Sequence, residues 1–468
     1  MVEGLEHLVL DTNILLIDAN NLIQKGKVVI VPETVIDEMD SKKSLIGSEL
    51  GYQARAFSRL LSKAEVLGVT TKSKGTHTLS TVAPQVTETL LKINDCYVMF
   101  VAFSHYTTQE GFSYSNDRKI LEVAKYYSVT KQAKFISNDN AARLRAISLG
   151  IVAEEFSIVE DIDVQFTREV VIENDLMFEM LNNKPVSQVI PDHKTGTYNY
   201  VVSNPNTSQV KLCFVDNNGM LIHLDSTIEK DIRKNVNIAP INTQQLFLAR
   251  AIQDTSIPLV ICEALAGSGK TLLTLSNGLR MVELGKYAGI VYIRHSVDDV
   301  PKEEEVGFLS GNDEKMAVYF HPLYDSIEVM VRGKHKNSKI KGKDFEDMIA
   351  AEVEKMITEH HIVPMTGLGL RGRTLTNQFV IIDEAQNPNS SSMQKTLTRI
   401  GKGCKVVVIG SNKQIDNPYS TKYTNGLSYL LNACKQENSI PVYGVDLHKV
   451  VRSDIAEFAE KLYSKEVK

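Results

Sequence analysis

The chain has 468 residues, of which 43% are hydrophobic, and this size and composition predict two or three globular domains with ordinary apolar cores. Its formal net charge is −5, from 52 basic and 57 acidic residues, which excludes a globally basic nucleic-acid-binding protein and leaves that role to local basic patches. No apolar run approaches the roughly 20 residues that cross a bilayer, the first residues lack a basic leader, and five dispersed cysteines without paired spacing argue against structural zinc. We therefore expect a cytoplasmic protein without a membrane partner.

Residues 1–155 are predicted to form an α/β domain, because short apolar strands such as 7–10 and 28–31 alternate with helix-like segments. Acidic residues follow these strands or stand where strands meet helices: Asp11, Glu38, Asp117 and Asp139. Converging carboxylates make an oxygen-rich site that suits Mg²⁺ or Mn²⁺ and in-line phosphodiester hydrolysis. Each acid by itself also suits a helix N-cap or a solvated loop.

The order of these acids, opening with the L-D-T-N strand end and closing with S-N-D, resembles the PIN-domain nucleases. The resemblance implies that the four acids hold the metal ions and that Asn13 supports them. Asp37 is the competing neighbour of Glu38, and we prefer Glu38 because it directly precedes the apolar Met39. Two readings stay open, a nuclease that cleaves RNA and a degenerate platform that binds it.

Residues 157–230 alternate apolar and polar side chains over short runs such as TYNYVVS, VKLCFVD and LIHLD. The Asn-Asn-Gly sequence at 217–219 separates two of these runs and predicts a hairpin turn. We expect a small β-rich module here, and no group of residues in it indicates chemistry.

Residues 264–271 read ALAGSGKT, one substitution away from the phosphate-binding loop G-x-x-x-x-G-K-[ST]. A predicted strand at 257–262 precedes the loop and a helix-like pattern at 272–279 follows it, as this way of binding a nucleoside triphosphate requires. The residues expected to hold ATP and Mg²⁺ are Gly267, Ser268, Gly269, Lys270 and Thr271. Ala264 replaces the first glycine, and its methyl group demands a negative φ at that bend.

Residues 379–386 read FVIIDEAQ, a buried-strand pattern that delivers two carboxylates to the C-terminal edge of a parallel sheet, where ligands collect. Asp383 is predicted to hold Mg²⁺ through water, and Glu384 to orient or deprotonate the attacking water. Taken alone, the stretch also suits a strand that ends in a solvated acidic turn.

From about residue 238 onward the chain resembles the PhoH-like ATPases. Six further motifs occur in the family's order: PINTQQ (240–245), EEVGFLSG (304–311), LRGRT (370–374), LTRIG (397–401), VVVIGSNKQID (406–416) and HKVVRSDIAEFA (448–459).

The PhoH-like resemblance implies roles for several of these residues. Gln245 would hydrogen-bond the adenine edge and favour ATP, Gln414 would sense the γ-phosphate, and Arg452 would be an arginine finger. Ser310 replaces a proline of the family pattern, and Ser411 replaces an aspartate, which would weaken the sensor. The resemblance also implies a ring-forming homo-oligomer in which Arg452 completes a neighbour's ATP site.

The stretch VRGKHKNSKIKGK, residues 331–343, is the clearest local attractor for a phosphate backbone in this acidic chain. We expect a loop near the ATP site that contacts single-stranded RNA, and a solvated surface loop is the alternative. Arg371 and Arg373 are further candidates for contact with phosphate or RNA.

We therefore predict an α/β protein with three parts: a PIN-like parallel-sheet domain (1–155), a small β-rich connecting module (157–230) and a RecA-like P-loop ATPase domain (238–468). The predicted function is ATP-dependent RNA processing that combines a metal-dependent endoribonuclease with an ATPase of helicase character. The alternatives are an RNA-remodelling ATPase with a non-catalytic PIN platform, and a nucleotide-controlled interaction protein in a toxin–antitoxin or phosphate-stress setting.

Overall fold

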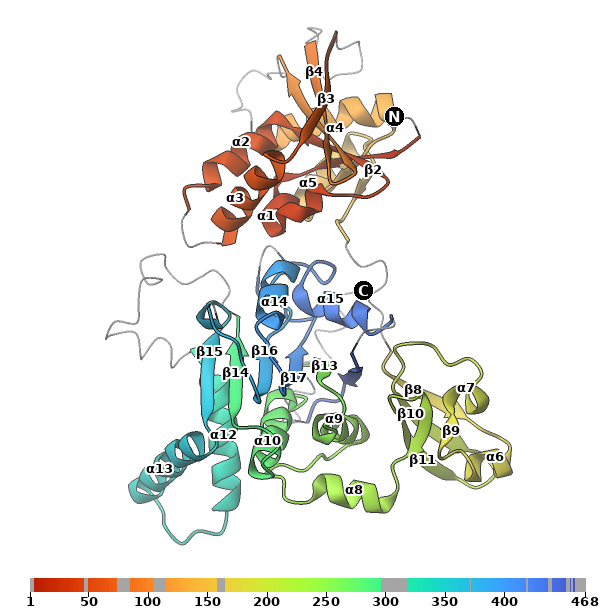
Figure 1. Cartoon of the computed structure of the whole chain (residues 1–468), viewed down its shortest axis with the longest axis vertical. Helices are drawn as coiled ribbons and strands as arrows, with labels where there is room; N and C mark the ends of the chain where they lie inside the picture. Colours follow the sequence, from red (N-terminus) through yellow and green to blue (C-terminus); the bar gives the residue numbers. More distant parts are fainter. Residues whose placement is uncertain are drawn as a thin grey trace. The chain divides into compact units, whose positions relative to one another are not determined.

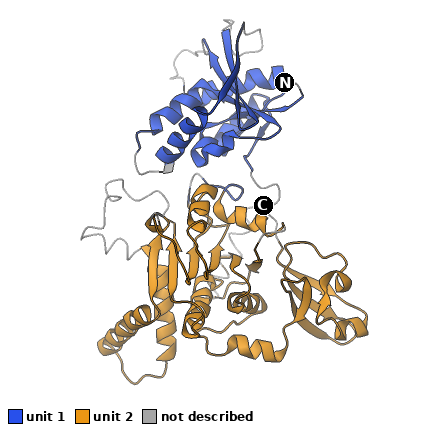
Figure 2. Ribbon diagram, in the orientation of Figure 1, with its two compact units in different colours: residues 1–158, 298–306, 417–424 blue, residues 159–297, 307–416, 425–468 orange. Residues whose placement is uncertain are grey.

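The computed structural model describes residues 4–45, 49–73, 85–104, 115–157, 165–295, 319–370, 372–417, 420–436 and 440–451, together with residues 455 and 458. The chain divides into two compact units. The first comprises residues 1–158, 298–306 and 417–424, and the second comprises 159–297, 307–416 and 425–468 (Figure 2).

The first unit is built on a seven-stranded sheet in the order β3-β4-β5-β2-β1-β6-β7 (Figure 1). Its strands are β1 (Glu6–Leu10), β2 (Lys27–Pro32), β3 (Glu65–Ser73), β4 (Gln85–Ile93), β5 (Cys96–Phe103), β6 (Lys134–Ile136) and β7 (Ala153–Glu154). The neighbouring strands β5, β2, β1, β6 and β7 run parallel to one another, whereas β3, β4 and β5 form an antiparallel meander. The parallel core confirms the predicted α/β class, and the β3–β4 pair had no counterpart in the prediction.

Helices follow the parallel strands of this sheet: α1 (Thr12–Ile17), α2 (Glu33–Lys42), α3 (Glu49–Leu61), α4 (Asn116–Lys131) and α5 (Asn140–Ser148). A short 3₁₀ turn covers Ala19–Leu22. β1 and β2 are almost wholly buried, as expected for parallel strands covered by helices on both faces. Their C-terminal ends consequently meet at one edge of the sheet.

The second unit contains the β-rich module, a five-stranded sheet in the order β8-β10-β11-β12-β9. Its elements are β8 (Thr167–Val171), α6 (Asp175–Glu179), β9 (Lys184–Pro185), α7 (Val186–Val189), β10 (Asn199–Asn204), β11 (Gln209–Val215) and β12 (Met220–His223). β11 and β12 pair antiparallel on either side of Asn-Asn-Gly, so the predicted hairpin is confirmed.

The rest of the second unit is built on a six-stranded parallel sheet in the order β15-β14-β16-β17-β13-β18 (Figure 1). Its strands are β13 (Leu259–Ala264), β14 (Ile290–Arg294), β15 (Ile362–Thr366), β16 (Phe379–Asp383), β17 (Lys405–Gly410) and β18 (Val442–Leu447). Its helices are α8 (Ser226–Arg233), α9 (Thr243–Gln253), α10 (Lys270–Glu283), α12 (His321–Lys334), α13 (Lys343–Glu359), α14 (Ser390–Leu397) and α15 (Gly426–Ala433), with a 3₁₀ turn at Leu368–Leu370. β16 and β17 are buried along their whole length, as their apolar runs predicted.

The β-rich module packs directly against β18, the edge strand of the parallel sheet. Phe166 lies on Gly444, where an added Cβ would come within 2.3 Å of the ring, so only glycine admits this contact. The backbone N–H of Phe166 donates to Asp446 Oδ1 at 3.0 Å, and Asn199 Nδ2 donates to the carbonyl oxygen of Gly444 at 3.3 Å. The module is therefore joined to the sheet by buried contacts as well as by the chain.

The basic stretch 331–343 differs from the single loop that was expected. α12 continues to Lys334 and α13 begins at Lys343, so only residues 335–342 connect the two helices. α12 has 14 residues, and at about 1.5 Å per residue it carries the connection roughly 20 Å from its own N-terminus. That N-terminus lies beside the C-terminal end of β14, because Arg294 Nη1 donates to the carbonyl oxygen of Tyr319 at 2.8 Å. The basic connection is thus remote from the edge where the strands end.

Within the described part of the chain, no helix is both long enough and apolar enough to cross a membrane. All five cysteines lie in described segments and are free thiols.

Two candidate sites

The acidic site of the first unit centres on Asp11, which directly follows β1 and caps α1. Its carboxylate accepts a hydrogen bond from the backbone N–H of Thr12 at 2.7 Å. Ser137 Oγ donates to it at 2.6 Å, and Asn13 Nδ2 donates at 2.9 Å. Burial nevertheless raises the pKa of Asp11 to about 6, against these hydrogen bonds. The site therefore makes ionisation of Asp11 costly unless a cation compensates it.

Glu38 approaches Asp11 from α2, and its negative charge contributes to the raised pKa of Asp11. Its carboxylate accepts hydrogen bonds from Thr12 Oγ1 and, at 2.7 Å, from Asn116 Nδ2. The neighbouring Asp37 is exposed on α2. This geometry favours Glu38 over Asp37 for the site, and its metal role stays a prediction.

The other two predicted ligands are engaged with their own surroundings. Asp117, in the first turn of α4, pairs with Arg145 Nη1 at 3.0 Å, although its charge also raises the pKa of Asp11. Asp139 caps α5, accepting from the backbone N–H of Ala141 at 2.7 Å. Among the described residues, no group of three or more His, Cys, Asp or Glu side chains is arranged to hold a metal ion. The structure thus brings Glu38 and Asp117 to Asp11 without a ready-made ligand set.

Sequence reasoning missed the small polar residues that organise this site, namely Thr12, Asn116 and Ser137. Ser137 Oγ links Asp11 to the backbone N–H of Asp139 at 3.1 Å, and so ties the first acid to the last. Thr12 lies in the L-D-T-N segment, Ser137 lies in the closing S-N-D segment, and Asn116 directly precedes Asp117. Their positions next to or near the acids in the sequence were the signal that could have identified them.

The phosphate loop of the second unit lies between β13 and α10. Gly267 and Gly269 have φ values of 68° and 81°, in the left-handed region that favours glycine, and Gly269 is the N-cap of α10. Ala264 is the last residue of β13, pairs with Leu447 of β18, and is not among the residues with positive φ. The missing first glycine therefore costs no backbone strain.

Gln245 is buried and holds this loop from α9. Its Nε2 donates to the carbonyl oxygen of Ser268 at 2.9 Å, and its Oε1 accepts from the backbone N–H of Ile241 at 2.9 Å. Both ends of the amide are thus occupied by main chain. The predicted contact with adenine stays a prediction, while the structure assigns the side chain to loop support.

The phosphate loop and the carboxylate strand meet through one hydrogen bond. Thr271 Oγ1 donates to Asp383 Oδ2 at 3.0 Å, although the two residues are 112 positions apart in the chain. Tyr292 donates to the same oxygen at 2.5 Å, and burial beside Asp383 raises the pKa of Tyr292. Lys270 makes no ion pair with any described residue, so its charge is available to a ligand.

Glu384 follows the strand in a left-handed conformation, with φ of 53°. Its Oε2 accepts from Gln386 Nε2 at 2.6 Å. The same amide nitrogen donates to the carbonyl oxygen of Gln414 at 2.7 Å, and Gln386 Oε1 accepts from the N–H of Ser411 at 3.0 Å. Ser411 therefore takes part through its backbone N–H. Gln386 connects the Glu384 carboxylate to the main chain of residues 411–414.

Several expectations fall on residues outside the described segments. These are Arg452, Arg371 and the segment 304–311 with Ser310. Arg373 is described and exposed. The roles given to these residues stay predictions.

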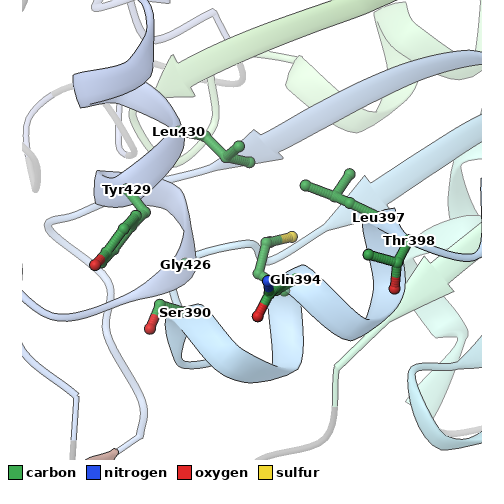
Figure 3. Close-up of a pocket in the computed structure, with 8 residues that line it drawn as sticks. Ser390, Gln394, Leu397, Thr398, Gly426, Tyr429 and Leu430 are labelled. Carbon is green, nitrogen blue, oxygen red and sulfur yellow. The ribbon is translucent and has the colours of Figure 1, made fainter. Parts of the chain in front are cut away.

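An apolar hollow of about 310 Å³ lies between α14 and α15, lined by Met393 and Leu397 on one side and Tyr429 and Leu430 on the other (Figure 3). None of the residues predicted to bind ATP lines it. The hollow shares no lining residue with the phosphate loop and gives no indication of nucleotide binding.

The residues of the second site fit ATP and Mg²⁺ by their chemistry. Ser268 is almost fully buried, and its Oγ has no hydrogen-bond partner among the described residues, which leaves a donor in the loop for a phosphate oxygen. The first turn of α10 adds backbone N–H groups, and Thr271 and Asp383 supply the oxygen ligands that Mg²⁺ prefers.

Fold and sites together define the class of this protein: a P-loop nucleotide-binding α/β protein that carries an additional α/β domain with an acidic site. Two family models give the particular family. Residues 8–157 match the PIN domain, and residues 237–464 match the PhoH-like proteins. The chain therefore carries an N-terminal PIN domain followed by a PhoH-like domain, as the motifs predicted.

The similarity to curated relatives extends over both domains. The chain is 29% identical over 479 residues to "Protein PhoH2" of Bacillus subtilis, covering 97% of this chain and 99% of that protein. It is 29% identical over 236 residues to "Protein PhoH" of Escherichia coli K12, covering 50% of this chain and 60% of that one. A "PhoH-like protein" of Mycobacterium tuberculosis H37Rv is 31% identical over 188 residues, or 40% of this chain and 47% of its own length.

Proposed function

We propose that this protein hydrolyses ATP at the P-loop site and uses the hydrolysis to remodel and process RNA. The observation that carries the proposal is the hydrogen bond of 3.0 Å between Thr271 and Asp383, which joins the phosphate loop to the carboxylate strand. Lys270 neutralises β- and γ-phosphate charge, and Thr271 and Asp383 would hold Mg²⁺, which would supply further positive charge. Glu384 orients or deprotonates the attacking water, and Gln414 lies on the same hydrogen-bonded network.

The PIN domain is proposed to cleave RNA with Mg²⁺ or Mn²⁺ held by Asp11, Glu38, Asp117 and Asp139. The raised pKa of Asp11 supports this, since a buried acid surrounded by acids is compensated best by a cation. The three-part division at 1–155, 157–230 and 238–468, the cytoplasmic location and the ring-forming homo-oligomer with Arg452 as finger belong to the same proposal.

A second candidate keeps the PIN domain as a non-catalytic RNA-binding platform. The pairing of Asp117 with Arg145 and the capping role of Asp139 favour it, because both acids are already engaged. A nucleotide-controlled interaction protein is the third candidate, and it predicts no stimulation of ATP turnover by RNA.

Incubation of the full chain with labelled RNA and labelled DNA, with and without ATP and Mn²⁺, tests these proposals. The nuclease predicts Mn²⁺-dependent cleavage of RNA that is lost in Asp139→Asn. Intact RNA together with RNA-stimulated ATP turnover indicates the platform, and absence of ATP turnover contradicts the proposed motor.

A further inference from the structure

Arg294 places a cation beside Glu384 at a position that no motif of the sequence marked. It is the last residue of β14 and pairs in register with Asp383 of β16. Its Nη2 lies 4.0 Å from Glu384 Oε1, and its side chain is only 22% exposed. It is anchored by its hydrogen bond to the Tyr319 carbonyl and by stacking over the Tyr319 ring at 5.2 Å.

Glu384 is restrained from two sides by these contacts. Oε2 accepts from Gln386, while Oε1 faces the guanidinium of Arg294. Its left-handed backbone conformation is one that a non-glycine residue keeps only when its surroundings hold it there. A carboxylate held in this way is not free to turn toward an attacking water.

The sheet order separates Arg294 from the phosphates. β14 is three strands away from β13, with β16 and β17 between them, which at about 4.8 Å per step amounts to roughly 14 Å. Glu384 follows β16 and so stands between Arg294 and the phosphate loop. Arg294 therefore acts on the carboxylate and not on the nucleotide.

We propose that Arg294 is a positioning residue that holds Glu384 in a resting orientation and so keeps unstimulated ATP hydrolysis slow. Hydrolysis then requires Glu384 to leave this pair and turn toward the phosphate loop. Because Arg294 is anchored at Tyr319, directly before α12, a displacement at the start of α12 withdraws the guanidinium and releases the carboxylate. This inference rests on the proposed ATP hydrolysis and adds a restraint to it.

The test is steady-state ATP turnover of the full chain carrying Arg294→Ala, Arg294→Lys or, as a matched control, Arg168→Ala. Arg168 is an arginine of the β-rich module that pairs with Asp192. We expect Arg294→Ala to raise the unstimulated kcat about three- to fivefold, the factor for losing one partly exposed charge pair, with KM for ATP nearly unchanged. Arg294→Lys keeps the charge and stays near the parental rate, as does the Arg168 control.

A double variant shows whether Arg294 acts through Glu384. Adding Arg294→Ala to Glu384→Gln should give no increase, because the restrained carboxylate is already gone. The inference is overturned if Arg294→Ala lowers kcat or leaves it unchanged while the parental chain hydrolyses ATP, or if the increase persists in the double variant. A parental chain without any ATP turnover overturns the proposed function itself, and a melting curve separates loss of fold from each of these results.

Discussion

The two candidate sites differ in how their charges are compensated. In the P-loop site the chain supplies its own partners, since Asp383 accepts from Thr271 and Tyr292 and Glu384 accepts from Gln386. In the acidic site, Asp11 accepts three hydrogen bonds and its pKa still rises to about 6. The carboxylates of the P-loop site are thus compensated by hydrogen bonds from other segments of the chain, whereas the chain leaves the charge of Asp11 largely uncompensated.

The largest effect is expected at the P-loop site. Glu384→Gln should lower ATP turnover by roughly 100- to 10,000-fold, the range for loss of a general base, while ATP binding persists because the phosphate loop is untouched. Turnover and nucleotide binding of the full chain measure this, with the exposed Glu359→Gln as control. Parental turnover in Glu384→Gln would show that another group handles the water.

The next effect tests the uncompensated charge of Asp11 through pH. The folded pKa is raised from 3.8 to about 6, so the folded state binds the proton more tightly than the unfolded state. The buried carboxyl group therefore does not destabilise the folded state below about pH 4. In the metal-free protein, the free energy of unfolding falls by up to roughly 3 kcal/mol as pH rises through about 6. Asp11→Asn should remove this loss.

Urea unfolding of the metal-free chain between pH 4.5 and 7.5 checks the Asp11 prediction, with the exposed Asp37→Asn as control. Mn²⁺ should raise the stability of the parental chain above pH 6 and leave Asp11→Asn nearly unaffected. If the free energy of unfolding of the parental chain depends on neither pH nor Mn²⁺, the proposal that this site binds a cation is contradicted.

A smaller effect is expected from the hydrogen bond that joins the first and last acids. Ser137→Ala removes the donor to Asp11 and the acceptor for the Asp139 backbone, and should weaken Mn²⁺ affinity about 10- to 100-fold, the usual cost for an outer partner of a metal ligand. Mn²⁺ titration followed by thermal unfolding measures it, with Ser62→Ala, at an exposed position directly after α3, as control. Unchanged affinity would remove Ser137 from the site.

The smallest effect concerns the basic connection between α12 and α13, which belongs to neither site. Replacing Lys336, Lys339 and Lys341 with Ser should flatten the slope of log RNA affinity against log salt by about 2, from about 0.7 per lost phosphate contact. A triple variant of exposed lysines elsewhere, Lys286, Lys355 and Lys402 to Ser, carries the same charge change. If both variants keep the parental slope, the connection is a solvated surface, and Arg371 and Arg373 become the next candidates.

The location of this connection in the fold could not be predicted from the sequence pattern. Its lysines were visible in the sequence, but their distance from the strand ends follows from the 14 residues of α12. Gln245 is a similar case, because only the fold reveals that its amide holds the Ser268 carbonyl, and its contact with adenine stays a prediction.

The sequence by itself determined the two domain families, the β hairpin at 217–219 and the phosphate loop, because these depend on local spacing: apolar runs for strands, glycines for left-handed turns and acids at strand ends. The tertiary structure alone decided that Thr271 meets Asp383 across 112 positions and that Gly444 admits Phe166. It also decided that Arg294 faces Glu384. Such contacts depend on strand order and on helix length, which bring distant residues together, and neither is written in the local pattern of the chain.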